Sequence, residues 1–263
     1  MRISSKTTGL SCRLPPHGAP LRRPVAYAIR LMVPALSIQR PMRPVTGRGK
    51  LRTGELGLAS KEPFLSLLYL QVMKKEDIIT LPNAHLRQKS ARVHVVTDDT
   101  KQLIEDMTSA ALDWEDSRPH EISAALAAVQ IDKLERVVIV RTDFETKENR
   151  DFTVLINPEI VKTEGELVAD YEGCLSVSKV YGKVPRWTKI RVRALDETGQ
   201  PVRFKAEGFL ARVIQHEIDH TNGMVFIDHI KDQTDAFYTL DENGELQPLD
   251  YHEHIENNEN LWT

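Results

Sequence analysis

The spacing of His216, Glu217 and His220 gives the clearest chemical signal in the chain. These residues belong to the segment His-Glu-Ile-Asp-His. On a helix, two histidines four residues apart project from one face, so both imidazoles can reach one metal ion. Glu217 directly follows the first histidine, where its carboxylate can act as a general base toward a water at that ion. Because ordinary surface helices also carry such patterns by chance, the segment by itself makes a metal site only a hypothesis.

Two further residues could complete this site. Cys174 stands in Tyr-Glu-Gly-Cys-Leu-Ser-Val, after a glycine and before an apolar run, which indicates the end of a strand. Its thiolate would be a strong third ligand for a borderline divalent metal, although a lone cysteine is more often a buried structural residue. Gln130 ends the apolar run 126–129. Its side-chain amide could donate to an oxyanion, or the residue could simply belong to a helix entry.

The three segments occur in the order and spacing typical of peptide deformylases, and the chain resembles that family over about residues 78–230. The family pattern G-x-G-L-A-A-x-Q is similar to SAALAAVQ at 123–130. E-G-C-L-S is complete at 172–176, and Q-H-E-x-D-H is complete at 215–220. The resemblance continues through VPRWTKIRVRALDETG and GMVFIDHI. Three ordered motifs are far more specific than one HExxH segment.

The resemblance implies a metal-dependent hydrolase that removes the formyl group from the N-terminal formylmethionine of nascent polypeptides and releases formate. In such an enzyme Cys174, His216 and His220 bind one divalent ion. That ion is usually Fe²⁺ in cells and can be replaced by Zn²⁺, Ni²⁺ or Co²⁺.

The same resemblance assigns the remaining catalytic roles. Glu217 is the general base on the metal-bound water and passes the proton to the departing amine. Gln130 and the backbone N–H of Leu175 stabilise the negative charge on the attacked formyl oxygen, each such donor contributing about 3 kcal/mol. Glu172 and Arg186 are expected to form a supporting ion pair behind the Cys174 loop.

The chain departs from the family in the first motif. Ser123 and Ala125 replace the two glycines. Glycine at these positions would permit a positive φ or let a substrate backbone lie close. We expect the peptide to bind as an added strand near Ala125 and the segment before Cys174. Because the metal ligands, Glu217 and Gln130 are all kept, we expect the chemistry to survive while substrate affinity differs.

Two other functions compete with this interpretation. One is an HExxH metallopeptidase with a different substrate, for which a cysteine ligand would be unusual. The other is a catalytically inactive, deformylase-like module that binds metal or the ribosome. Formate release separates both from a deformylase.

The elements that must position these residues form an α+β pattern. A helix capped by Asp99 or Thr100 should run through Trp114, because its apolar residues recur at helical spacing. A second should span Gly208–Asn222 and end at Gly223. Strands are expected over residues 136–140, 152–156, 189–195 and 202–206. This grouping predicts antiparallel or mixed β-sheets around a central helix that carries the HExxH motif.

The chain of 263 residues divides unevenly in charge, although its net charge is only −3. Residues 1–72 hold 12 basic and two acidic side chains, and we expect them to be a disordered basic leader. Residues 73–230 should be the catalytic domain. The acidic tail, 231–263, could form a hairpin through Glu242, Asn243 and Gly244. The sequence contains no apolar run long enough for a membrane span, and its two cysteines favour a reducing compartment.

Two origins fit the basic leader. We favour Met73 as the true start, which would make the protein cytoplasmic in a bacterium; a transit peptide would place it in a mitochondrion or plastid. Residues 73–263 carry 23 basic and 36 acidic side chains. This acidic balance argues against stable nucleic-acid binding, so any ribosome contact should be transient. The expected partners are N-formylmethionyl nascent peptides, with no membrane.

Overall fold

The computed structural model describes residues 72–118, 121–144 and 146–262, so the predicted leader up to residue 71 lies outside the described residues. The helices are α1 (Asp98–Asp116), α2 (Gly208–Thr221), α3 (Tyr251–His254) and α4 (Glu259–Trp262). The strands are β1 (Ala125–Ala127), β2 (Val137–Arg141), β3 (Phe152–Cys174), β4 (Val177–Leu195), β5 (Pro201–Glu207), β6 (Phe237–Leu240) and β7 (Leu246–Pro248). Four 3₁₀ turns complete the list: η1 (Lys75–Asp77), η2 (Ala84–Arg87), η3 (Ala128–Ile131) and η4 (Phe226–Ile230). None of the described helices is long and apolar enough to cross a membrane.

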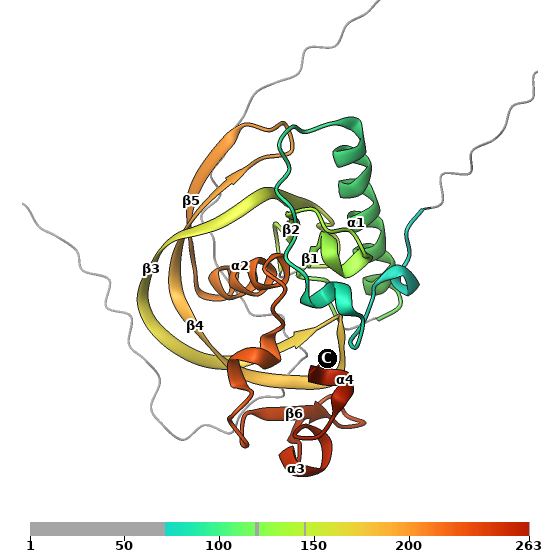
Figure 1. Cartoon of the computed structure of the whole chain (residues 1–263), viewed down its shortest axis with the longest axis vertical. Coiled ribbons are helices and arrows are strands. Elements are labelled where there is room, and N and C mark those ends of the chain that lie inside the picture. Colours follow the sequence, from blue (N-terminus) through green and yellow to red (C-terminus); the bar gives the residue numbers. More distant parts are fainter. Residues whose placement is uncertain (1–71, 119–120, 145, 263) are drawn as a thin grey trace, which may run out of the picture.

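The strands form one sheet in the order β1-β2-β3-β4-β6-β7, with β5 paired to β4, and every pair is antiparallel. The long strands β3 and β4 curve around α2, whereas α1 lies beside β1 and β2 (Figure 1). The helix with the HExxH motif is therefore central to an α+β fold, which confirms the predicted fold class.

β3 and β4 are much longer than the sequence suggested. We predicted strands over 152–156 and 189–195, whereas β3 extends to Cys174 and β4 begins just beyond the following turn. Pro158 concealed the continuation, because proline usually marks the end or the edge of a strand. The chain absorbs it by an irregularity at Asn157, where φ is +53° and the register with β4 shifts.

Local sequence sets the ends of the two main helices. The predicted cap, Asp99 or Thr100, is wrong, because Thr97 caps α1. The Thr97 hydroxyl accepts the N–H of Thr100 at 3.4 Å, and the Thr100 hydroxyl accepts the N–H of Thr97 at 3.2 Å. α2 ends before Gly223, which has a φ of +76°. A Cβ atom there would lie 2.5 Å from the carbonyl oxygen of Arg87, so the helix end requires glycine.

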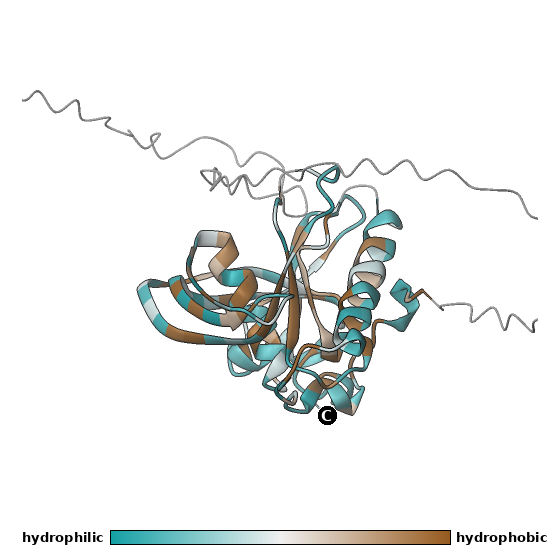
Figure 2. Cartoon of the chain, turned by 90° about the horizontal axis from the view of Figure 1, so that it is seen from above, coloured by the Kyte–Doolittle hydropathy of each residue, from teal (hydrophilic) through white to brown (hydrophobic). Residues whose placement is uncertain are grey.

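The core lies on both faces of the sheet. Along β2, Val138 and Val140 belong to the hydrophobic cluster under α2, while Val137 and Ile139 belong to the cluster under α1. Burying each such side chain contributes about 1.5–3 kcal/mol. In Figure 2 the central strands are mostly brown, and teal predominates on the surrounding turns. This two-sided packing fixes α2 against the sheet.

The C-terminal segment packs against the end of the same sheet. Phe237, Ile255 and Leu261 are buried in a third hydrophobic cluster. Arg87 donates to the Asp228 carboxylate at 2.7 and 2.9 Å and to the carbonyl oxygen of Leu261 at 2.6 Å. β6 and β7 form an antiparallel hairpin with its turn at residues 241–245. The described part of the acidic tail is thus an integral layer of the fold.

Candidate metal centre

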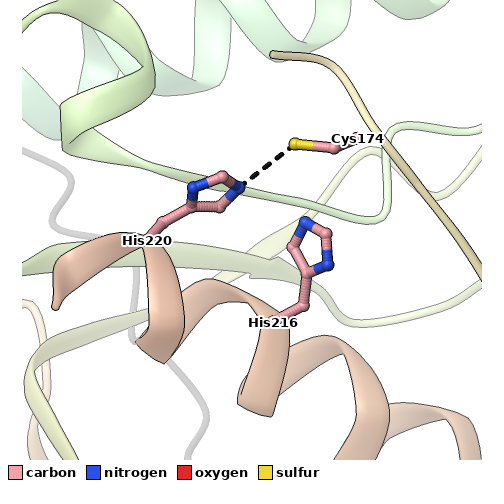
Figure 3. Close-up of side chains that lie close together, drawn as sticks. All are labelled: Cys174, His216 and His220. Atoms are coloured by element: carbon pink, nitrogen blue, oxygen red, sulfur yellow. Dashed lines mark hydrogen bonds between the residues drawn. The ribbon is translucent and has the colours of Figure 1, made fainter. Parts of the chain in front are cut away.

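The side chains of Cys174, His216 and His220 converge on one point. Their ligand atoms all lie within 4.8 Å of one another. Figure 3 shows two imidazoles from successive turns of α2 beside the sulfur at the end of β3. The Sγ atom of Cys174 is 3.2 Å from Nε2 of His220. The fold therefore brings together the three predicted ligands from segments more than forty residues apart.

The chemistry of these donors fits a borderline divalent ion. One sulfur and two imidazole nitrogens form a three-ligand set that leaves further coordination positions for solvent or substrate. Burial alone would raise the pKa of the Cys174 thiol, but His220 and His216 outweigh it and lower that pKa to about 5. The thiolate, which is the form that binds metals, therefore predominates at neutral pH. The buried Nδ1 atom of His220 has no partner among the described residues.

Glu172 orients His216 from behind. One Glu172 oxygen lies 2.9 Å from Nδ1 of His216, which leaves Nε2 for the ligand cluster. The same carboxylate accepts two hydrogen bonds from Arg186, at 2.9 and 3.0 Å, and one from Arg212, at 2.8 Å. Burial opposes the charge, but His216 and Arg186 hold the pKa of Glu172 well below its usual range. The expected Glu172–Arg186 pair is present as part of a larger buried cluster.

Three further residues of this charged cluster were not predicted from the sequence: Arg212, Asp219 and His229. Arg212 precedes His216 by four residues on α2, so helical spacing could have identified it. Asp219 lies inside the Q-H-E-x-D-H segment, bonds to Arg186 and accepts from His229 at 2.6 Å. These contacts tie the buried charges of α2 to β4 and η4.

Gln215 anchors α2 to β4 beside the site. Its side-chain oxygen accepts the N–H of Trp187 at 3.1 Å, and its amide nitrogen donates to the Trp187 carbonyl at 2.9 Å. The same nitrogen donates to the carbonyl of Ala211 at 2.8 Å. A glutamine next to the first histidine therefore holds the helix in register with the sheet.

Glu217 is buried on the same helix, but its surroundings differ from those of Glu172. Its Oε2 atom has no hydrogen-bond partner among the described residues. Burial raises the pKa of this carboxyl to about 7, against the lowering effect of His216 and His220. A buried, unpartnered carboxyl oxygen next to the ligand cluster is suited to exchange a proton with a bound molecule.

Gln130 points its amide toward the ligand cluster. Its oxygen accepts the N–H of Ala127 at 2.9 Å, so the NH₂ group turns toward Ser176 Oγ, 3.2 Å away, and Cys174 Sγ, 3.7 Å away. The backbone N–H of Ser176 also reaches the sulfur at 3.4 Å. Leu175 lies in the turn between Cys174 and Ser176 and lines the pocket beside the ligand cluster.

A pocket of about 210 Å³ opens beside the cluster. Its walls come from the first motif, from the end of β3 and from α2, and Gln130, Cys174, His216 and Glu217 lie along it. A fourth contribution was not foreseen: Leu240, Gly244 and Leu246 of the C-terminal hairpin also line the pocket.

Comparison with known proteins gives a consistent result. The family model described as polypeptide deformylase matches residues 75–236. A peptide deformylase of Thermomicrobium roseum is 42% identical over 176 residues, which cover 66% of this chain and 96% of the relative. The chain belongs to the peptide deformylase family.

Solved structures agree with that assignment. A Synechococcus elongatus peptide deformylase in complex with actinonin has a TM-score of 0.52 and 35% identity, covering 59% of this chain and 79% of that one. A Legionella pneumophila peptide deformylase has a TM-score of 0.52 and 36% identity, covering 60% and 85%. This chain is therefore a hydrolase of the deformylase type, and metal dependence is a property of its family.

The altered deformylase motif fits the backbone better than its sequence suggested. Ala125 is a buried residue of β1, paired with Val140, and is absent from the positive-φ residues of the described chain. Of the two reasons considered for a glycine here, the positive φ does not apply, because Ala125 lies in an extended strand that accepts alanine. Ser123 is also buried, and its N–H donates to Glu115 at 3.0 Å.

Proposed function

We propose that this chain hydrolyses the formamide bond of N-formylmethionyl peptides, using one Fe²⁺ ion held by Cys174, His216 and His220. The convergence of a thiolate and two imidazoles beside the buried Glu217 carboxyl carries the proposal. When bound, such an ion acidifies a coordinated water and polarises a carbonyl oxygen. The catalytic domain is proposed to comprise residues 73–230.

Glu217 moves the proton in this proposal. Its unpartnered Oε2 atom accepts a proton from the attacking water and delivers it to the amine as the formamide C–N bond breaks. Formate and a free N-terminal amine result. Glu172 does not take part, because its oxygens are already engaged by His216, Arg186 and Arg212.

Gln130 and Leu175 stabilise the charge that develops on the formyl oxygen. The Gln130 NH₂ group already faces the ligand cluster, and its orientation is fixed by the bond from the N–H of Ala127. Leu175 contributes its backbone N–H from the turn after Cys174. Removal of one such donor costs about 3 kcal/mol of transition-state stabilisation.

The peptide backbone is proposed to add as a strand along β1. β1 is the first strand in the sheet order, so within the described chain only one of its edges is paired. Residues 123–125 and residues 171–175 both line the pocket. A peptide between these walls would gain main-chain hydrogen bonds, while the pocket beside the cluster accepts the methionine side chain.

We propose transient rather than stable contact with the ribosome, because residues 73–263 are acidic overall. The compartment depends on where the natural chain begins. We favour a start at Met73 and a cytoplasmic, bacterial enzyme, and a mature N-terminus within residues 1–72 would support an organelle instead. Sequencing the N-terminus of the natural protein distinguishes these outcomes.

The test is formate release from formyl-Met-Ala-Ser by protein loaded anaerobically with Fe²⁺ and checked for metal content. We expect turnover by the loaded protein and none after chelation. Cleavage at an internal peptide bond would support a metallopeptidase instead. Stoichiometric metal binding without any turnover would support a non-catalytic module.

A further inference from the structure

The hairpin β6–β7 lines part of the pocket, and it lies outside the residues that the family model matches. The match ends at residue 236, and β6 begins at Phe237. Leu240 and Leu246 are directly opposite each other in the hairpin register, and both line the pocket. Paired residues in an antiparallel ladder project from the same face of the sheet. The two leucines therefore form one apolar patch at the pocket.

Three contacts hold the hairpin against the rest of the fold: strand pairing, a contact between two tyrosine rings and a buried phenylalanine. β6 pairs with β4 at Tyr181 and Gly182, and Tyr181 itself lines the pocket. The ring of Tyr238 meets that of Tyr171 edge-on at a centroid distance of 4.9 Å. Phe237 is buried at the root of the hairpin. The leucine patch is thus attached to residues that already border the pocket.

The turn of the hairpin is also fixed. Oδ1 of Asp241 accepts the N–H groups of Asn243 and Glu245 at 2.8 and 2.9 Å, and its other carboxylate oxygen accepts from Gln247 at 3.0 Å. Gly244 turns the chain with a φ of +75°. Because these bonds order the turn without a ligand, the patch is preformed and little entropy is lost when a peptide contacts it.

The position of the patch indicates which part of a peptide it meets. Tyr181 packs on Gly173, since a Cβ atom on Gly173 would lie 2.6 Å from the Tyr181 ring. Tyr238 is one strand beyond Tyr181, and Leu240 is two residues farther along the same face. Two strand spacings from Gly173 to Tyr238 and two residues along β6 make about 12 Å in total, a span that an extended peptide covers with three or four residues.

We propose that Leu240 and Leu246 form an apolar subsite for the peptide side chain two residues after formylmethionine. This inference rests on the proposed function, because it assumes that the formyl group lies at the metal cluster. It extends that function by naming a specificity-determining surface: the enzyme should prefer substrates with a large apolar third residue over those with a small polar one.

The experiment compares formyl-Met-Ala-Leu with formyl-Met-Ala-Ser. We expect the unchanged protein to favour the leucine peptide about fivefold in kcat/KM, mainly through KM, because the contact adds buried apolar area. The double variant Leu240→Ala, Leu246→Ala should lose this preference, because its KM for the leucine peptide rises toward its KM for the serine peptide. Leu167→Ala is the matched control: Leu167 is a surface leucine, 56% exposed, that does not line this pocket.

Thermal unfolding and metal content show whether the double variant is intact. Should it be unstable, Leu240→Asn with Leu246→Asn keeps the side-chain shape, makes the patch polar and should likewise abolish the preference. Equal use of the two peptides by the unchanged protein, or an unaltered preference in a folded variant, would overturn the subsite. Absence of formate release from both peptides would overturn the proposed function and the subsite together.

Discussion

Two buried glutamates lie beside His216, and their surroundings are opposite. Glu172 is bonded to His216, Arg186 and Arg212. Glu217, one residue after His216 on α2, has an oxygen without a partner among the described residues. The pKa of Glu172 is lowered, although burial opposes this, whereas burial raises that of Glu217 to about 7.

The different surroundings of the two glutamates indicate different roles, one in positioning His216 and the other in proton transfer. A buried carboxylate with all its bonds made is fixed in charge and orientation, so it can orient a neighbouring imidazole. A buried oxygen without a bond costs folding free energy, about 1–3 kcal/mol, and such a cost is expected where a bound molecule supplies the missing partner. We therefore assign Glu172 to support and Glu217 to proton transfer.

The largest expected effect on activity comes from removing one of the three proposed metal ligands. Cys174→Ala takes away the only sulfur of the described cluster, so stoichiometric metal binding and formate release should be lost together. Metal analysis and a formate assay on the same sample measure this. His254→Ala, on α3 and outside the cluster, is the control and should retain both. Full metal content and rate in Cys174→Ala would show that the third ligand is another residue.

Glu217→Gln tests the reacting member of the pair. The amide retains the shape of the side chain but cannot accept the proton, so kcat should fall by at least about 10²-fold while metal remains bound. Steady-state kinetics with metal analysis separate the two effects. If the metal is lost instead, Glu217 has a structural role and the contrast between the glutamates disappears.

Glu172→Gln tests the supporting member. It removes a buried charge that faces two guanidinium groups, so the metal-free protein should lose about 3 kcal/mol of unfolding free energy in urea. Metal affinity should fall about 10- to 100-fold, because His216 is less firmly oriented. With saturating metal, much of the kcat should return, unlike in Glu217→Gln. Glu159→Gln, in the more exposed pair with Arg193, should have a much smaller effect on stability.

The sequence predicted most of the site because its chemistry lies in short local patterns. Helical spacing alone placed His216 and His220 together, local context raised Cys174 and Gln130 as candidates, and the resemblance gave them their roles. Helical spacing could have identified Arg212, whereas His229 contacts Asp219 and Arg186, which lie on other elements that local sequence does not bring together with it. The leucines of the hairpin were missed for the same reason. Nothing local to residues 240–246 indicates that β6 pairs with β4 beside the pocket.

The pocket wall should matter less than either glutamate, and Ala125→Gly measures how much. Two reasons favour a lower KM with glycine at this position: glycine permits a positive φ, and it removes a methyl group that could face the incoming peptide. The extended, paired backbone of Ala125 removes the first reason, so the variant tests the second at a buried residue of the pocket wall.

We now expect KM for formyl-Met-Ala-Ser to change by about twofold or less and kcat to stay the same. Glycine within a strand should cost about 0.5–1 kcal/mol of stability, visible in urea unfolding. Ser123→Gly, outside the strand, is the control for the substitution itself. A several-fold fall in KM confined to Ala125→Gly would show that the methyl group obstructs the peptide. The first motif would then limit substrate binding in a way that its backbone geometry does not reveal.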